Sequence, residues 1–265
     1  MSEVFYRIRS ICAPAFTPTG FSSLIRPVRI GPFTIDSPGD WRLELTAATQ
    51  RLLGDTIALT NEDWRADSLL AGWTRAHIAS HLAFQAQALA KMAHQLRETQ
   101  EPVAWKSMQP DAVLNLGAQR NALALQEDLD QSSADLMNAF DLLDESHWKN
   151  QVQTSQGTLP SQSLLLDRLN EIIVHHVDLV LGFEFTDVQP AVTRALLQWN
   201  LFRAMPRFTQ IRLRINSDEG FSVAVGAGTK VTVRGSEAQL LAWLTGRKDS
   251  SGITGADDLD LGGPV

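Results

Sequence analysis

The sequence predicts a helical bundle followed by a smaller α+β part. Apolar residues recur at helical spacing from residue 40 to about residue 181, and loops rich in Pro, Gly, Ser and Asp interrupt the pattern. In the last third, apolar and polar residues alternate over short stretches, as they do in half-buried strands. We therefore expect two domains, at residues 39–185 and 186–250.

Four helices are predicted in the first domain. The apolar face of the first consists of Leu45, Ala48, Leu52 and Ile57. The second should begin after Thr74, a residue type that favours the N-cap position, and the fourth should end at Gly182. Residues 61–74 are expected to form a loop. The helices are predicted at residues 40–57, 75–97, 112–143, as one helix or a pair, and 163–181.

The second domain is predicted to contain a helix at residues 191–204 and three strands, in the segments IRLRIN, FSVAV and VTVRG. Ser236 should cap a last helix, with Gln239 at the capping-box position. The two ends of the chain lack such patterns. We expect residues 1–38 to be an irregular extension and residues 251–265 to be a flexible tail.

Composition excludes several classes of function. The chain has 265 residues and one cysteine, Cys12, which excludes an intramolecular disulfide, a CxxC redox pair and a cysteine-rich zinc site. A net charge of −7 without a basic stripe argues against nucleic-acid binding. No apolar run is long enough to cross a bilayer, and the N-terminus does not resemble a signal peptide. We expect a cytoplasmic protein.

Polar residues recur on the predicted core helices. His77 and His81 are four residues apart on the second helix, as are Glu171 and His175 on the fourth, so each pair shares a face. Catalytic zinc sites use three His and carboxylate ligands, and bundles build metal sites from facing helices. A Glu–His pair on a helix surface, or a hydrogen-bonded core histidine, explains the same spacing equally simply.

Three segments resemble a known family. GWTRAHIASHLAFQAQAL and DRLNEIIVHHVDLVLGF resemble two helix motifs of mycothiol-dependent maleylpyruvate isomerases, and LLAWLTGR resembles the end of their C-terminal domain. The resemblance spans residues 40–247. It implies a DinB-like four-helix bundle, a small C-terminal α+β domain, and a divalent metal, normally zinc.

The resemblance also assigns roles to residues. The implied metal ligands are His81, Glu171 and His175. Arg247, near the end of the last helix, is the expected catalytic residue, because an arginine binds a substrate carboxylate through two parallel hydrogen bonds. Arg168 and Arg120 are expected to bind the cofactor. Asp178 is a candidate to hydrogen-bond a ligand imidazole and fix its tautomer.

The implied reaction is isomerisation of maleylpyruvate to fumarylpyruvate. A thiolate adds to the cis double bond, the resulting single bond rotates, and elimination restores a trans double bond. The thiol would be mycothiol, the low-molecular-weight thiol of actinobacteria. Gln85, Gln87 and Asn170 depart from the family pattern and leave the substrate open. The alternatives are a mycothiol S-transferase acting on electrophiles and a non-catalytic DinB-like binding protein.

Overall fold

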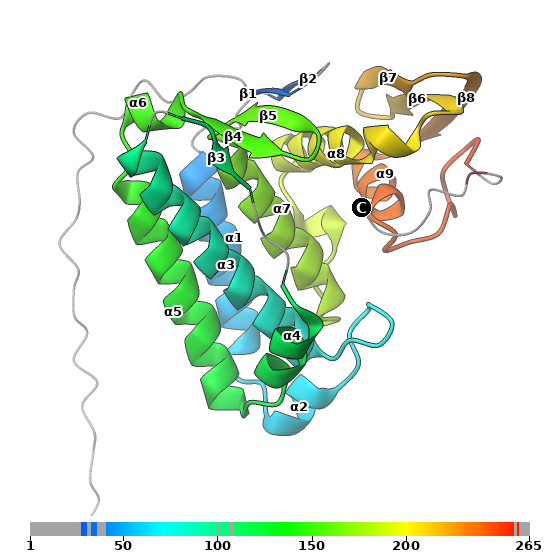
Figure 1. Cartoon of the computed structure of the whole chain (residues 1–265). Coiled ribbons are helices and arrows are strands. Elements are labelled where there is room, and N and C mark those ends of the chain that lie inside the picture. The colour runs from blue at the N-terminus through cyan, green and yellow to red at the C-terminus, as the bar shows by residue number, and fades with distance from the viewer. Residues whose placement is uncertain are drawn as a thin grey trace, which may run out of the picture.

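Four long helices pack side by side as a bundle in the computed structural model (Figure 1). They are α1 (Trp41–Thr56), α3 (Arg75–Glu98), α5 (Ala122–Asp141) and α7 (Ser163–Asp178). Helix α3 packs along α5, α1 packs against α7, and α3 also contacts α7. The predicted four-helix bundle is confirmed. The structure describes residues 28–30, 33–35, 41–99, 101–105, 109–256 and 259.

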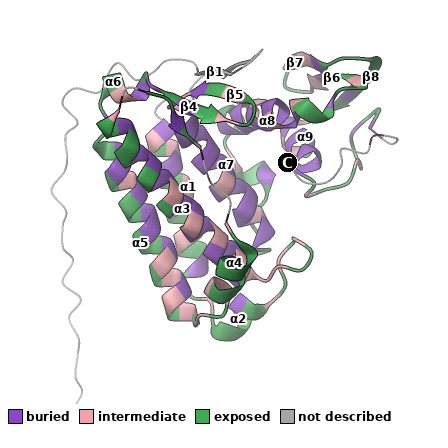
Figure 2. Cartoon of the chain, in the orientation of Figure 1, coloured by how far each residue is buried: buried purple, intermediate pink, exposed green. Residues whose placement is uncertain are grey.

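The apolar stripes of the four helices meet in one core (Figure 2). Leu45 and Leu52 of α1 are buried, as their spacing predicts, and they join Ile78 and Leu82 of α3. Ile57, which we expected on the same face, is 72% exposed. The prediction is wrong there because α1 ends at residue 56, one residue before Ile57.

Capping residues determine where the short helices begin. Helix α2 (Asn61–Arg65) lies in the predicted loop, because Thr60 and Asp63 form a capping box in which the Thr60 amide donates to Asp63 Oδ2 at 2.8 Å. The third predicted helix is a pair, α4 (Asp111–Ala118) and α5, and Asn121 caps α5 by accepting from the Ala124 amide at 2.9 Å. A further turn, α6 (Glu145–Trp148), follows α5.

A small sheet that we did not predict covers one end of the bundle (Figure 1). It consists of β3 (Val103–Ala104), β4 (Gln151–Thr154) and β5 (Gly157–Pro160). Strands β4 and β5 form an antiparallel hairpin, and β3 pairs with β4 in parallel. The strands are too short and too polar for period-two alternation to reveal them. The hairpin matters for function because residues 154–156 and Leu159 line the cavity described below.

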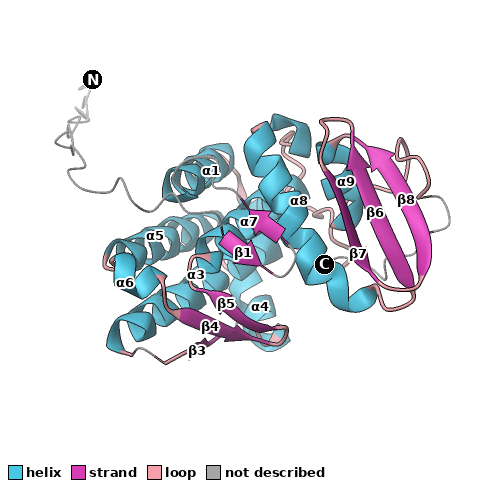
Figure 3. Cartoon of the chain, turned by 90° about the horizontal axis from the view of Figure 1, so that it is seen from above, coloured by secondary structure: helices cyan, strands magenta, loops and turns pink. Residues whose placement is uncertain are grey.

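The C-terminal part has the predicted α+β content (Figure 3). Helix α8 (Pro190–Ala204) packs against α7 and α9 (Glu237–Leu244). The sheet has the order β7-β6-β8, with β6–β7 antiparallel and β6–β8 parallel. The predicted capping box is present, since the Ser236 amide donates to Gln239 Oε1 at 3.0 Å. The strands are β6 (Ile211–Ser217), β7 (Ser222–Gly226) and β8 (Thr229–Gly235), and short 3-10 turns are η1 (Phe185–Asp187) and η2 (Met205–Arg207).

The two ends differ from the predictions where they are described. Within the expected extension, β1 (Val28–Ile30) and β2 (Phe33–Ile35) pair antiparallel, and residues 1–27, 31–32 and 36–38 lie outside the described residues. Residues 251–256, expected in a flexible tail, return to the sheet, because Thr254 exchanges backbone hydrogen bonds of 2.8 and 3.0 Å with Arg234. No helix in the described part of the chain is both long and apolar enough to span a membrane.

Candidate metal centre

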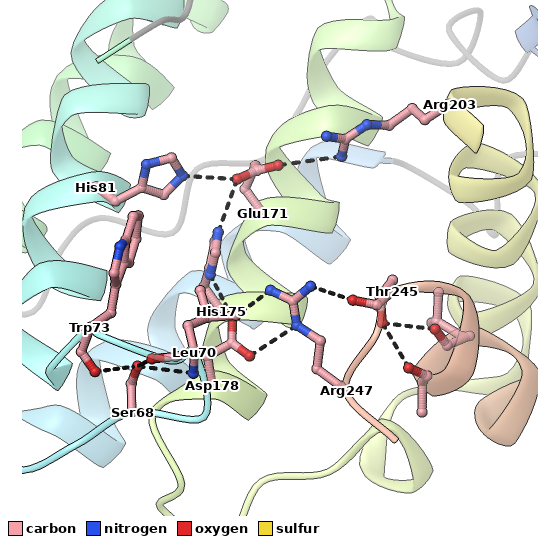
Figure 4. A network of polar contacts seen from close by, with 12 residues as sticks. Ser68, Leu70, Trp73, His81, Glu171, His175, Asp178, Arg203, Thr245 and Arg247 are labelled. Atoms are coloured by element: carbon pink, nitrogen blue, oxygen red, sulfur yellow. Dashed lines mark hydrogen bonds and ion pairs between the residues drawn. The ribbon is translucent and has the colours of Figure 1, made fainter. Parts of the chain in front are cut away.

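Two helices bring the three predicted metal ligands together. His81 lies on α3, and Glu171 and His175 lie one turn apart on α7 (Figure 4). His81 Nε2 lies 3.2 Å from Glu171 Oε2, and His175 Nε2 lies 3.3 Å from the same oxygen. All three candidate ligand atoms are within 4.8 Å of one another. The cluster is half-buried to buried, at the floor of a cavity.

The spacing of these atoms fits a divalent ion. In a tetrahedral site with ligand distances of about 2.0–2.2 Å, neighbouring ligand atoms lie about 3.3–3.6 Å apart. The two separations from Glu171 Oε2, 3.2 and 3.3 Å, are close to that value. Two imidazoles and one carboxylate are also the ligand types of catalytic zinc, whereas Ca²⁺ and Mg²⁺ favour oxygen ligands. The residues present therefore fit a zinc-like ion.

The hydrogen bonds of His175 require a cation beside it. His175 Nδ1 lies 2.7 Å from Asp178 Oδ2, so this nitrogen carries a proton and donates it to the carboxylate. In a neutral imidazole the lone pair of Nε2 then faces Glu171 Oε2, another acceptor, at 3.3 Å. Either a second proton or a metal ion must lie between them. Burial would lower the pKa of His175, but its hydrogen bonds with Asp178 and Glu171 outweigh burial and raise the pKa.

Glu171 is the shared centre of the cluster. Burial would raise its pKa, but hydrogen bonds from His175 and His81 hold the pKa well below the usual range of a glutamate. Its second oxygen, Oε1, faces away from the imidazoles and lies 3.5 Å from Arg203 Nη1 (Figure 4). The carboxylate is therefore ionised and ready to bind a cation through Oε2.

A buried ion pair fixes the orientation of His175. Asp178, fully buried, accepts from Arg247 Nε at 3.0 Å and from Arg247 Nη2 at 2.7 Å. Burial would raise the pKa of Asp178, but the bonds from His175 and Arg247 lower it. Arg247 also donates through Nη1 to the Thr245 carbonyl. The predicted contact of Asp178 with a ligand imidazole is present, and an ionised Asp178 holds His175 in the tautomer that presents Nε2.

The loop before α3 completes the wall beside His81. The ring of Trp73 lies 5.6 Å from the ring of His81, measured between centroids. Ser68 Oγ donates to the Trp73 carbonyl at 2.8 Å (Figure 4). The Leu69 amide donates to the Asp178 carbonyl at 2.9 Å. The loop is thus tied to the end of α7. Sequence reasoning missed this role of Trp73, which depends on a contact between distant segments.

The other two histidines of the motifs have different partners. His77 accepts at Nδ1 from the Thr74 amide at 3.1 Å, and its Nε2 lies 3.2 Å from Asn115 Oδ1. His77 therefore caps α3. His176 points away from His175, as the rotation of about 100° per residue predicts, and its Nε2 lies 3.0 Å from Asp55 Oδ2. Neither imidazole belongs to the group of three ligand atoms.

A cavity of about 560 Å³ opens over the cluster. Residues of α7, α8, the β4–β5 hairpin and the segment around Trp105 line it. Trp105 and Trp199 stack with their ring centroids 6.4 Å apart and form an aromatic wall. Two arginines also line the cavity, Arg203 from α8 and Arg247 from the segment after α9. Arg203 was not among the predicted site residues, because no local motif marks it.

The structure does not bring Arg168 and Arg120 to this cavity, against the expectation that they bind the cofactor. Arg168 is 1% exposed and donates to the Leu82 carbonyl at 2.8 Å, inside the bundle. Burial lowers its pKa to about 10. Arg120 donates to the Gly117 carbonyl at 2.9 Å and to Asp128 Oδ2 at 2.8 Å. Both side chains have structural partners instead.

Arg168 still influences the cavity indirectly. Its Nη1 donates to Gln85 Oε1 at 2.6 Å, and Gln85 Nε2 donates to Asp167 Oδ2 at 3.1 Å. Asp167 lines the cavity, and burial together with the neighbouring Glu171 raises its pKa to about 7. Gln85, one of the departures from the family pattern, therefore fixes a polar side chain of the cavity.

Comparisons with known proteins agree with this geometry. A family model described as the mycothiol maleylpyruvate isomerase N-terminal domain matches residues 45–180. The chain is similar to the crystal structure of a mycothiol-dependent maleylpyruvate isomerase, with a TM-score of 0.74, and to a histidine-to-alanine mutant of that enzyme, with a TM-score of 0.73. Each of the two is 25% identical in sequence to this chain, and the matched region covers 85% of this chain and 95% of the other. No curated protein matches the chain.

Proposed function

The chain belongs to the mycothiol maleylpyruvate isomerase N-terminal domain family, and from this premise we propose that it is a metal-dependent isomerase of maleylpyruvate that uses mycothiol. One observation carries the proposal. His81, Glu171 and His175 converge on a point that opens into a cavity large enough for a small acid and the reactive end of a thiol. Three protein ligands leave a fourth position free, as in catalytic rather than structural zinc sites.

The metal and the thiol would each supply one kind of chemistry. His81, Glu171 and His175 would hold a divalent ion, which would lower the pKa of a neighbouring thiol so that thiolate is available at neutral pH. The thiol supplies the nucleophile that turns the cis double bond into a single bond, which rotates before elimination restores the double bond as trans.

The residues of the chain position these groups. Asp178 and Arg247 hold His175 in one tautomer and orientation, which lowers the reorganisation needed when a cation binds. Trp105 and Trp199 give the same cavity an aromatic wall against which the apolar part of a substrate or thiol can pack. An arginine of the cavity stabilises the negative charge that develops on a conjugated acid when a nucleophile adds to it.

A pair of variants on one helix tests the proposal. His81→Ala removes a ligand, and His94→Ala removes an exposed histidine of the same helix α3. We expect about one metal ion per chain and mycothiol-dependent loss of maleylpyruvate absorbance in the wild type and in His94→Ala, and loss of both in His81→Ala. Metal content and turnover are measured on the same preparations. If His81→Ala keeps its metal and its turnover, the ligand assignment is wrong.

The aromatic wall supports a second candidate, a mycothiol S-transferase. Trp105, Trp199 and Phe202 offer an apolar surface in the same cavity as the ligand residues, which suits an uncharged electrophile. The same metal-assisted thiol chemistry would then end at addition rather than continue to elimination. Supplying zinc-loaded protein and mycothiol with either maleylpyruvate or a bimane electrophile separates the two, since only the isomerase regenerates the thiol.

A further inference from the structure

We propose that Arg203 is the side chain that binds a substrate carboxylate, and that Arg247 is a positioning residue that acts through Asp178. This inference deepens the proposed function and rests on it for the carboxylate nature of the substrate. It departs from the sequence-based expectation, in which Arg247 binds the carboxylate. The bonds that each guanidinium already makes carry the inference.

The guanidinium of Arg247 is already occupied. Its Nε and Nη2 donate to the two oxygens of Asp178, at 3.0 and 2.7 Å, and its Nη1 donates to the Thr245 carbonyl. The Nε–Nη2 edge of an arginine is the edge that binds a carboxylate through two parallel hydrogen bonds. The side chain is only 4% exposed, and its partner Asp178 is fully buried. A substrate anion would have to break a buried ion pair to reach Arg247.

The ion pair between Arg247 and Asp178 also attracts an anion only weakly. The positive charge of Arg247 lies against the negative charge of Asp178, so the two charges largely cancel for an anion in the cavity that Arg247 lines. Asp178 in turn accepts the Nδ1–H of His175 at 2.7 Å. The effect of Arg247 on the site is therefore transmitted through Asp178 to the orientation of a ligand imidazole.

Arg203 differs from Arg247 in its exposure and in its hydrogen bonds. Its side chain is 30% exposed and lines the cavity. Its contact within the described part of the chain is with Glu171 Oε1, at 3.5 Å from Nη1, which is long for a hydrogen bond. The Nε and Nη2 groups have no hydrogen-bond partner among the described residues. A planar edge with free N–H donors is thus available to an incoming carboxylate.

The backbone around Arg203 keeps this side chain at the cavity. Gln156 Nε2, from the tip of the β4–β5 hairpin, donates to the Arg203 carbonyl at 3.0 Å. This bond ties α8 to the hairpin on the rim of the cavity. The guanidinium then extends to Glu171, whose Oε2 faces the two imidazoles while Oε1 faces Arg203 (Figure 4).

Arg203 and the two ligand imidazoles contact the same residue, Glu171, so the proposed carboxylate site and the proposed metal site are adjacent. A carboxylate bound by Arg203 lies next to the carboxylate that also contacts His81 and His175. Because Glu171 contacts both Arg203 and the imidazoles, the carbons next to a carboxylate bound there lie close to the ligand cluster. This arrangement predicts a preference for acids whose double bond lies close to a carboxylate.

Binding of maleate, a non-reacting dicarboxylate probe, tests the assignment. Trp105 and Trp199 line the cavity, so quenching of tryptophan fluorescence in the zinc-loaded full-length protein reports binding. We expect Arg203→Gln to raise the Kd for maleate on the order of 10- to 100-fold, the range of a charge-assisted hydrogen bond. Arg207→Gln removes an exposed arginine four residues later, outside the cavity lining, and should leave the Kd within about twofold.

The role of Arg247 has its own readout. Arg247→Lys should leave maleate binding within about threefold of the wild type and weaken zinc binding on the order of 10- to 100-fold, measured by competition with a chelator. The inference is overturned if Arg203→Gln binds maleate like the wild type, if Arg247→Lys alone abolishes maleate binding, or if the wild type binds no maleate. Intact maleate binding without mycothiol-dependent turnover would instead count against the proposed function alone.

Discussion

Metal binding should stabilise the fold measurably, because the ligands join two helices. His81 on α3 and Glu171 on α7 are 90 residues apart in the chain. Two of the separations between ligand atoms, 3.2 and 3.3 Å, are already close to those of a tetrahedral zinc site, and all three atoms lie within 4.8 Å of one another. At free zinc about 100-fold above Kd, the free energy of unfolding should rise by about 2.7 kcal/mol.

That free energy corresponds to a clear thermal shift. For a domain of about 150–250 residues, 1 kcal/mol moves Tm by about 2–4 °C, so zinc should raise Tm by about 5–11 °C. The assay is thermal unfolding followed by circular dichroism, on chelator-treated protein with and without added zinc. His94→Ala should show the full rise and His81→Ala almost none. An equal rise in both variants would refute the reasoning, because zinc would then stabilise the protein from another site.

Two further predictions concern the sheet and the ligand orientation. Gly226 has φ +79°, and a Cβ there would lie 2.4 Å from the Ile211 carbonyl oxygen, whereas Gly220 has φ +88° with open space around it. Gly226→Ala should therefore lower the free energy of unfolding by about 2–5 kcal/mol and Gly220→Ala by about 1–2 kcal/mol in urea titrations; equal losses would contradict the packing argument. Asp178→Asn should weaken zinc binding about 10- to 100-fold in a chelator competition, because the charged partner of the His175 imidazole is lost. Unchanged affinity would show that this carboxylate does not orient the ligand.

Local signals predicted most of the helices and strands. The Thr74 cap marks the start of α3, and Ser236 with Gln239 marks the start of α9. The alternating segments became β6, β7 and β8, with end residues shifted by one or two. These features depend on neighbours within about four residues, so a single sequence contains the information. The spacing of Glu171 and His175 on one helix face belongs to the same class.

Other features depend on contacts between distant segments. Arg168 matches an arginine of the family motif, which favoured a role in the site, but the bundle turns it toward the Leu82 carbonyl. Helical periodicity gives the residues of one face and does not tell a cavity from a polar network in the core. Arg203 has no motif at all, and only the packing of α8 against α7 places it beside Glu171.

The charges of the cluster explain why the proposed chemistry suits this site. The carboxylates of Glu171 and Asp178 lie against the guanidiniums of Arg203 and Arg247, so the charges of these four side chains largely cancel. A divalent ion then adds two positive charges inside a half-buried cavity, where electrostatic interactions are stronger than in water. A thiolate and a substrate carboxylate would both be attracted by this positive charge. A site of this kind can hold two anions close together, which is the requirement of a reaction in which one anion attacks another.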